Sequence, residues 1–485
     1  MKKMVCFLAI LGFVLSGVLF ITNLSVLLEA TIQPAAGGER KVTTTTIVDG
    51  TNFKVRTGTF TVSPDGKRVA WARKVDDGWA VEVDGKIQAT HDEVGPLEDG
   101  QAGEASAEFP GFKPMVFSAD GQHLAYSAEV DGSWVMIHDG LKGKPYENLG
   151  GPVLSRDGQH LAYAAQNDDG WCVVSDGVEG KTYEKVGPPA ISPDGKRVAY
   201  VVRADGKERM VIDGVEGKPY DRISIFPKLV ATFFNPHMVL AWPLFSLDGR
   251  VAYPAKNAGG WYMVVDRQES EVFEDVHDPT FSPDGKRLAF PAQKKGFKWS
   301  IVVDGKALGS FDETAKEAFT TDSTVRPVAF SPDSMHYAAA VKVAGKWSIF
   351  VDGAMSGSET YEEAGFPVFS HDGNRLAYVA KKGKQWLAVI DGVAQKPYFA
   401  VQPPVFAPDG SHVAYAAASL APSIWVAVVD GVEGKATGVL RGLAFDDNTH
   451  LHYLALLGPR FLLFREELPV GSQPPPVEAN PGNPR

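Results

Sequence analysis

Short apolar runs alternate with turns rich in Gly, Asp and Pro along most of this chain. The unit at its clearest has an apolar run at 367–370, a His-Asp-Gly turn and a second run at 376–380. A Lys-Lys-Gly-Lys turn follows, then a third run at 386–390, an Asp-Gly turn and a short segment at 396–399. Runs of this length bounded by turn residues predict β-strands joined by hairpins. Each unit therefore predicts four antiparallel strands.

The unit recurs along the chain, and its first turn marks each copy. This turn reads Ser-Pro-Asp-Gly or a variant, which suits a type I turn with Gly in the left-handed fourth position. The copies begin at Ser63, Ser118, Ser155, Ser192, Ser246, Ser282, Ser331, Ser370 and Ala407, with a degraded copy at Phe445. Repeats of four short strands spaced near 40 residues are typical of β-propellers. The sequence predicts an all-β propeller of about ten four-stranded blades, with two smaller propellers, broken near 223–243, as the alternative.

A tryptophan recurs at one position of the unit, five residues before the second turn Asp or its equivalent. It occupies this place at Trp79, Trp134, Trp171, Trp261, Trp299, Trp347, Trp386 and Trp425. A bulky aromatic group that recurs once per blade favours packing between blades. A ring of carbohydrate-stacking platforms is the alternative. A tyrosine ahead of the following blade has the same structural interpretation.

An arginine or histidine stands just past the first turn of every copy. The set is Arg68, His123, His160, Arg197, Arg250, Arg287, His336, Arg375, His412 and His450. Because these histidines belong to different blades, we interpret them as cations beside turn aspartates rather than as metal ligands. No segment has the alternating Asp/Asn layout of an EF-hand. The sequence predicts no metal site and no cofactor.

The chain also resembles a known repeat family. Ser-Pro-Asp-Gly-Lys-Arg-Val-Ala at 63–70 and 192–199, and Ser-Pro-Asp-Gly-Lys-Arg-Leu-Ala at 282–289, are similar to the WD40-like (PD40) repeat of TolB-type propellers. The resemblance covers about 43–466 and implies the propeller fold. It also implies, as one functional alternative, a TolB-like component of an envelope complex.

The ends of the chain differ from the repeats. An apolar run from Met4 to Leu28 follows two lysines, which predicts a signal anchor or transmembrane segment over 1–30 with the propeller on the exported side. Cleavage of this segment and secretion is the alternative. A linker is expected at 31–42, the propeller at 43–468 and a disordered Pro-rich tail at 469–485. Residues 43–50 match a third strand, yet they could also supply a missing outer strand and close the ring.

Three inserts interrupt the even spacing, at 86–114, 223–243 and 306–327, the last with a helix-compatible stretch around Glu313–Phe319. Inserts in repeat arrays often carry binding. The candidate binding residues are therefore Phe226, Phe233, Phe234, His237, Trp242, His91, Asp92 and Glu93.

Charge and motifs narrow the function. The net charge of −11 argues against nucleic acid as a partner. Only two cysteines occur, so no internal disulfide is expected. The sequence has no Gly-x-Ser-x-Gly, Walker, His-Glu-x-x-His or Cys-x-x-Cys motif, and no catalytic residue is predicted. We expect a membrane-tethered propeller that binds a protein or glycan of the cell envelope without chemistry of its own. A propeller hydrolase or lyase acting on a polysaccharide is the alternative.

Overall fold

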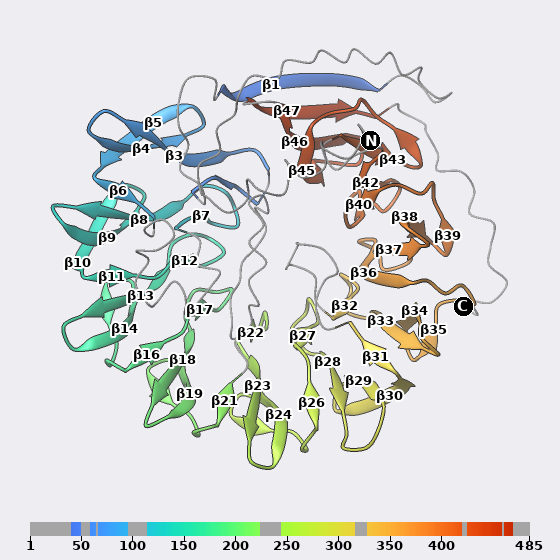
Figure 1. Cartoon of the computed structure of the whole chain (residues 1–485), viewed down its shortest axis with the longest axis horizontal. Helices are drawn as coiled ribbons and strands as arrows, with labels where there is room; N and C mark the ends of the chain where they lie inside the picture. Colours follow the sequence, from blue (N-terminus) through green and yellow to red (C-terminus); the bar gives the residue numbers. More distant parts are fainter. Residues whose placement is uncertain are drawn as a thin grey trace, which may run out of the picture.

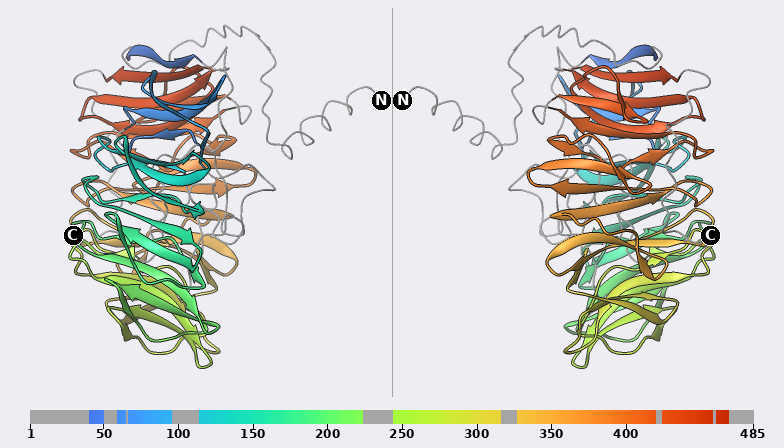
Figure 2. Two further views of the ribbon diagram at one scale, coloured as in Figure 1. Left: turned by 90° about the vertical axis from the view of Figure 1, so that its left-hand side faces the viewer. Right: turned by 90° about the vertical axis from the view of Figure 1, so that its right-hand side faces the viewer.

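The computed structural model describes residues 40–49, 59–64, 66–95, 114–223, 244–315, 327–419, 424–457 and 460–468. Their regular structure consists of β-strands in ten antiparallel sheets. Each sheet is one blade, and we number the blades 1 to 10 in chain order. In Figure 1 the blades are arranged around a centre, and Figure 2 shows the ring from the side.

The first five blades are built from 24 strands. Blade 1 contains β2 (Thr61–Val62), β3 (Val69–Val75), β4 (Gly78–Val83) and β5 (Lys86–His91). Blade 2 contains β6 (Glu93–Val94), β7 (Met115–Phe117), β8 (Leu124–Val130), β9 (Ser133–His138) and β10 (Leu141–Tyr146). Blade 3 contains β11 (Asn148–Leu149), β12 (Val153–Leu154), β13 (Leu161–Asn167), β14 (Gly170–Ser175) and β15 (Val178–Glu179). Blade 4 contains β16 (Lys185–Val186), β17 (Ala190–Ile191), β18 (Val198–Ala204), β19 (Lys207–Ile212) and β20 (Val215–Glu216). Blade 5 contains β21 (Arg222–Ile223), β22 (Leu244–Phe245), β23 (Val251–Asn257), β24 (Gly260–Val265) and β25 (Gln268–Glu269).

The other five blades follow the same plan. Blade 6 contains β26 (Asp275–Val276), β27 (Thr280–Phe281), β28 (Leu288–Gln293), β29 (Trp299–Val303) and β30 (Lys306–Phe311). Blade 7 contains β31 (Glu313–Thr314), β32 (Val328–Phe330), β33 (Tyr337–Val343), β34 (Lys346–Val351) and β35 (Ala354–Met355). Blade 8 contains β36 (Glu363–Phe369), β37 (Leu376–Lys382), β38 (Gln385–Ile390) and β39 (Val393–Ala394). Blade 9 contains β40 (Ala400–Val401), β41 (Val405–Phe406), β42 (Val413–Ala418), β43 (Trp425–Val429) and β44 (Val432–Glu433). Blade 10 contains β45 (Val439–Phe445), β46 (His450–Leu457), β47 (Arg460–Glu467) and β1 (Lys41–Asp49).

The inner strand of most blades is made in two pieces. In blade 3, for example, β11 pairs with one end of β13, and β12 pairs with the other end. The residues between the two pieces step out of the ladder, as at a β-bulge. In Figure 1 the second of the two pieces, as in β7, β12, β17, β22, β27 and β32, lies nearest the centre of the ring.

The turns have the geometry that their residues favour. In blade 4 the amide of Gly195 donates to the carbonyl of Ser192 at 2.8 Å, and Gly195 has a φ of +75°. This is the type I turn that the sequence predicts. The turns that follow the third strands of blades 1 to 9 are Asp-Gly except for Asp266-Arg267 of blade 5, and all hold Asp at a φ between +45° and +53°. This is the left-handed region that Asp and Gly tolerate in two-residue hairpins.

Ten buried hydrophobic clusters hold the ring together, each shared by two neighbouring blades. The cluster between blades 1 and 2 includes Val81 and Tyr126, and the one between blades 4 and 5 includes Tyr220 and Tyr253. The remaining junctions have equivalent clusters. Blades 4 and 5 pack on each other as the other neighbours do, so the chain forms one ring and not two.

The two ends of the described chain meet in blade 10. Strand β1 pairs antiparallel with β47 from Lys41↔Glu467 to Asp49↔Arg460, and so forms the outermost strand. The assignment of 43–50 to a third strand is therefore wrong, whereas closure of the ring by this segment is confirmed. Blade 10 packs on blade 1 through a cluster that contains Trp71 and Leu454.

No helix long and apolar enough to span a membrane occurs among the described residues. The predicted segment 1–30 and the tail 469–485 lie outside them.

Candidate functional site

All three inserts leave the ring at the same structural position. In blade 2 the inner strand stops at Val94 and resumes at Met115; in blade 5 it stops at Ile223 and resumes at Leu244. In blade 7 the break lies between Thr314 and Val328. The corresponding link in blade 3 is only 150–152. All three inserts therefore lie between the two pieces of an inner strand.

Two insert boundaries differ from the sequence interpretation. Residues 86–91 and 306–311 are ordinary outer strands, β5 and β30, and not parts of inserts. Glu313 and Thr314 belong to strand β31, so a helix does not begin there. These segments pair with the third strands of their blades, β4 and β29.

Most of the predicted binding residues cannot be placed. Phe226, Phe233, Phe234, His237 and Trp242 lie outside the described residues.

The structure does place the other three candidates. His91 is buried, and its Nε2 lies 3.1 Å from the hydroxyl oxygen of Tyr126 in blade 2. Burial, followed by the charge of Lys142, lowers the pKa of His91. Asp92 accepts a hydrogen bond from the amide of Asp131, and Glu93 lies in β6. His91 thus occupies a packing position between blades 1 and 2.

The recurring tryptophans lie opposite an aromatic residue of the fourth strand or its equivalent, except Trp425, which lies opposite Thr437. Trp171 pairs with Tyr183 and Trp386 with Tyr398, while Trp79 pairs with His91. Seven of the eight tryptophans belong to an inter-blade cluster or pack against one, Trp134 being the exception. Packing between blades is therefore confirmed as the role of this position. His91 is the histidine that stands in for the aromatic partner in blade 1.

The recurring arginines and histidines join turns within and between blades. In eight blades they pair with the aspartate of the Asp-Gly turn, as Arg375 does with Asp391 at 2.9 Å. Arg250 and His450 instead pair with an aspartate of the preceding turn. Arg375 also donates to the carbonyl of Gly410 in blade 9 and lies over the ring of Phe406. A structural cation beside a turn aspartate is confirmed, and it also bridges neighbouring blades.

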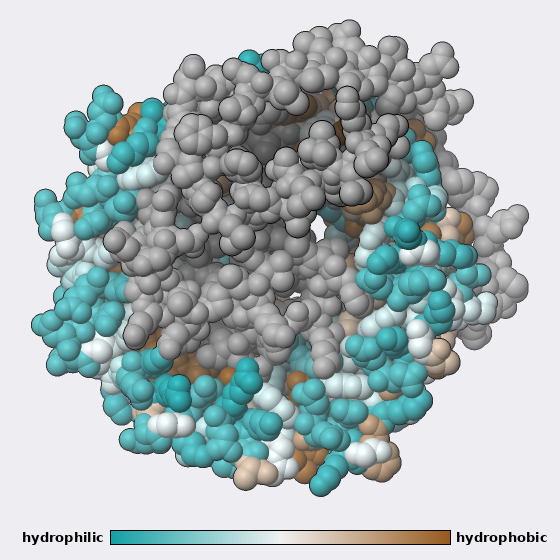
Figure 3. All heavy atoms as spheres, viewed as in Figure 1, coloured by the Kyte–Doolittle hydropathy of each residue, from teal (hydrophilic) through white to brown (hydrophobic). Residues whose placement is uncertain are grey.

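A second bridge links the outer strands of several blades. The hydroxyl of Tyr398 and the ammonium of Lys396 both donate to Glu433 of the next blade, at 2.8 and 2.7 Å. Blades 2, 3 and 4 make the equivalent contact to the blade that follows each. Figure 3 shows that the described outer parts of the ring are largely hydrophilic, with scattered apolar residues. The outer surface is thus a solvated rim.

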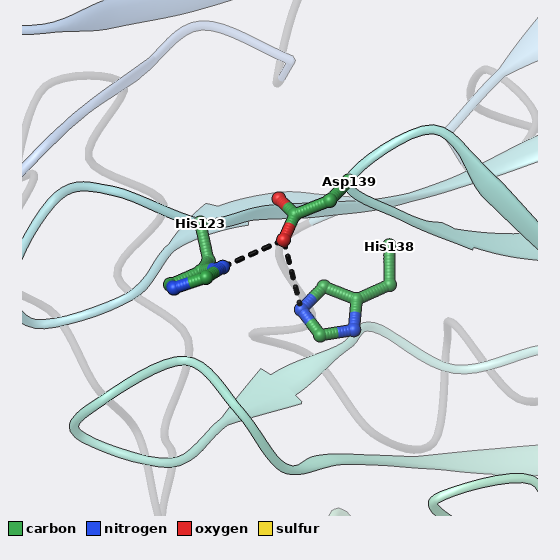
Figure 4. Close-up of side chains that lie close together, drawn as sticks. All are labelled: His123, His138 and Asp139. Atoms are coloured by element: carbon green, nitrogen blue, oxygen red, sulfur yellow. Dashed lines mark hydrogen bonds and ion pairs between the residues drawn. The ribbon is translucent and has the colours of Figure 1, made fainter.

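One group of titratable side chains goes beyond this repeated pattern. His123 Nδ1 lies 2.6 Å from Asp139 Oδ2, and His138 Nε2 lies 3.7 Å from the same oxygen. Figure 4 shows the carboxylate between the two imidazole rings. Burial raises the pKa of Asp139, but the hydrogen bonds from His123 and the Leu124 amide, with the charges of both histidines, outweigh it and leave the pKa lowered.

Sequence reasoning found His123 as a member of the repeat but missed His138. His138 ends an apolar strand and directly precedes the turn aspartate, which is the only signal that could have identified it. The group is the one cluster of three potential metal ligands found among the described residues.

Comparisons with known proteins concern the fold. No family model and no curated protein matches the chain. Among solved structures, a eukaryotic initiation factor matches with 13% identity and a TM-score of 0.39, over 76% of this chain and 95% of that one. The Dos1 propeller matches with 10% identity and a TM-score of 0.32, over 76% of this chain and 95% of that one. TolB from Acinetobacter baumannii matches with 13% identity and a TM-score of 0.26, over 87% of this chain and 80% of that one.

The strand pairing itself establishes the predicted fold. The chain is an all-β propeller with ten described blades.

Proposed function

We propose that this propeller is a binding scaffold whose partner contacts the segments that leave the inner strands of blades 2, 5 and 7. One observation carries the proposal: each insert interrupts the same place in its blade, so the three segments start and end at equivalent positions of the ring. A rigid ring that projects several variable segments is a common arrangement for recognition, because the scaffold fixes their relative positions.

The repeated polar residues support a role without chemistry. The cations of the repeat contact turn aspartates, and five of the arginines also donate to carbonyls of the next blade. Contacts of this kind stabilise blade junctions, so their recurrence has a structural cause. The partner that we propose is a protein or glycan of the cell envelope.

The cellular setting of the proposal rests on the sequence. The apolar run from Met4 to Leu28 supports a propeller that is tethered to a membrane on its exported side. Protease treatment of spheroplasts that express the full chain tests this location. Digestion of the propeller with the inner membrane intact supports it, and full protection contradicts it.

Replacement of the inserts tests the binding role. The short link 150–152 of blade 3 is a natural template, because it joins the two pieces of an inner strand. Three variants would carry this link in place of 95–114, 224–243 or 315–327, and a variant truncated after Leu468 would serve as the control. Binding to isolated peptidoglycan fragments and chemical crosslinking to envelope proteins are the two assays.

We expect at least one replacement to remove binding while the thermal unfolding temperature stays near that of the parent. The control should bind as the parent does. Equal binding by the control and all three replacements, or no binding by the parent in either assay, would contradict the proposal.

A further inference from the structure

Blade 2 has a histidine where the other blades have a residue that cannot bind a metal well. The residue before the Asp of the Asp-Gly turn is His138 in blade 2. At the same position, before the turn aspartate, blades 1 and 3 to 9 have Val83, Ser175, Ile212, Val265, Val303, Val351, Ile390 and Val429. The ion pair between His123 and Asp139 repeats in blade 3 as His160 with Asp176, without a neighbouring histidine. The inter-blade contact therefore does not require His138.

The three side chains are close enough to share one cation. Their ligand atoms lie within 4.8 Å of one another. Zinc binds imidazole and carboxylate at about 2.0–2.2 Å with tetrahedral geometry, which places ligand atoms about 3.4 Å apart. Asp139 Oδ2 lies 2.6 Å from His123 Nδ1 and 3.7 Å from His138 Nε2. Small side-chain rotations therefore bring these atoms to the spacing of a metal site.

The surroundings leave His138 Nε2 available and hold His123 and Asp139 in place. His138 Nε2 is buried and makes no hydrogen bond within the described part of the chain, a state that costs free energy unless a ligand satisfies it. Asp139 Oδ1 accepts the amide of Leu124 at 2.9 Å, which fixes the carboxylate. His123 Nε2 lies 3.1 Å from the side-chain amide of Gln159 in blade 3. Such outer contacts orient metal ligands.

We propose that His123, His138 and Asp139 form a binding site for a divalent transition-metal cation of the zinc class. His123 Nδ1, His138 Nε2 and Asp139 Oδ2 are the ligands, and water completes the coordination because the Asp139 side chain is 42% exposed. Two imidazoles and one carboxylate suit Zn²⁺, Co²⁺ or Ni²⁺ and not Ca²⁺ or Mg²⁺, which prefer oxygen ligands. Since His123 contacts blade 3, the bound cation braces the junction of blades 2 and 3.

Comparison of the blades suggests one substitution that removes the proposed metal site and another that builds the same site in blade 3. His138→Val installs the residue that blades 1, 5, 6, 7 and 9 have at this position, so we expect the ring to fold. Ser175→His adds the third side chain beside His160 and Asp176, whose facing atoms are 2.8 Å apart. Calorimetric titration of the untagged chain with Zn²⁺, and with Ca²⁺ for comparison, measures the affinity and the number of sites.

We expect the parent chain to bind one Zn²⁺ and to bind Ca²⁺ much more weakly. Loss of an outer contact to a metal ligand weakens binding by about 10–100-fold, so His138→Val should weaken Zn²⁺ binding by at least about 100-fold. Ser175→His should bind a second Zn²⁺. Visible absorption of the Co²⁺ form reports the ligand geometry and should disappear in His138→Val. Unchanged Zn²⁺ affinity in His138→Val, or no binding by the parent chain at micromolar Zn²⁺, would overturn the proposal, whatever the outcome of the insert replacements.

Discussion

The closing strand β1 depends on a buried ion pair, and its removal should open the ring locally. Arg40 Nη1 donates to Glu466 Oε2 at 2.8 Å, and the two side chains are 9% and 0% exposed. Arg40 Nη2 also donates to the carbonyl of Val432 in blade 9. After Arg40→Ala, the buried Glu466 still accepts a hydrogen bond from the hydroxyl of Tyr453 at 2.6 Å.

The size of the effect follows from burial. Removal of one partner of a buried pair costs about 3–5 kcal/mol, and the bond from Tyr453 places the change at the lower end, about 3 kcal/mol. The neighbouring Lys41 offers a matched control, because its pair with Glu467 spans 3.5 Å between side chains that are 76% and 49% exposed. Exposed pairs contribute about 0–1 kcal/mol.

Hydrogen–deuterium exchange of a peptide that covers 41–49 measures this difference directly. A loss of about 3 kcal/mol in the local opening free energy corresponds to exchange that is faster by about two orders of magnitude. We expect this acceleration in Arg40→Ala and at most a severalfold change in Lys41→Ala. Equal and small effects of both substitutions would refute the role of the buried pair in closure.

Three further perturbations test the contacts that build the blades. Arg375→Ala removes charged hydrogen bonds to Asp391 and Gly410 and should lower the free energy of unfolding, measured by urea titration, by about 2 kcal/mol. Arg375→His should lower this free energy by less, since other blades have His at this position. Ile349→Ala truncates a side chain that is 0% exposed between blades 7 and 8, and should lower the free energy of unfolding by about 2–5 kcal/mol. The control Ile424→Ala, at a residue that is 38% exposed, should change this free energy by no more than about 0.5 kcal/mol. Acid should destabilise the ring through the first-turn aspartates: the hydroxyl of Ser192 lowers the pKa of Asp194, and a serine does the same in other blades. Because the folded pKa values are depressed, this stability is present above about pH 4, the unfolded value, and is lost as the pH falls through the folded values. Calorimetric melting from pH 7 to pH 3 should show the decline, and Ser192→Ala should make it shallower; a melting temperature independent of pH in this range would contradict this prediction.

Local patterns determine much of this fold, which is why the sequence predicts it. The Ser-Pro-Asp-Gly turns and Asp-Gly hairpins act within a few residues, so the blades can be counted from them. The tryptophan position could also be interpreted correctly, because a side chain that recurs once per blade must meet equivalent neighbours. Closure by β1 was foreseeable as well, since an unpaired strand at one end matched an incomplete blade at the other.

Contacts between residues far apart in the sequence could not be predicted from these local patterns. In eight blades the partner of the recurring cation lies on a later turn, as with Arg68 and Asp84, and the arginines make a second contact in the next blade, as with Arg68 and Gly121. His138 looks like one polar residue at the end of an apolar strand. Only the pairing of β8 with β9 shows that it lies beside His123 and Asp139.

The most direct test of the scaffold proposal is site-specific photo-crosslinking in cells. A photoreactive residue would replace Ala105, Asn235 or Thr320 in the inserts, or the outer-strand residues Leu141 and Val393, which are 77% and 54% exposed. We expect a partner to crosslink from the insert positions and not from the outer strands. Crosslinks that arise only from Leu141 and Val393 would contradict recognition through the inner-strand segments.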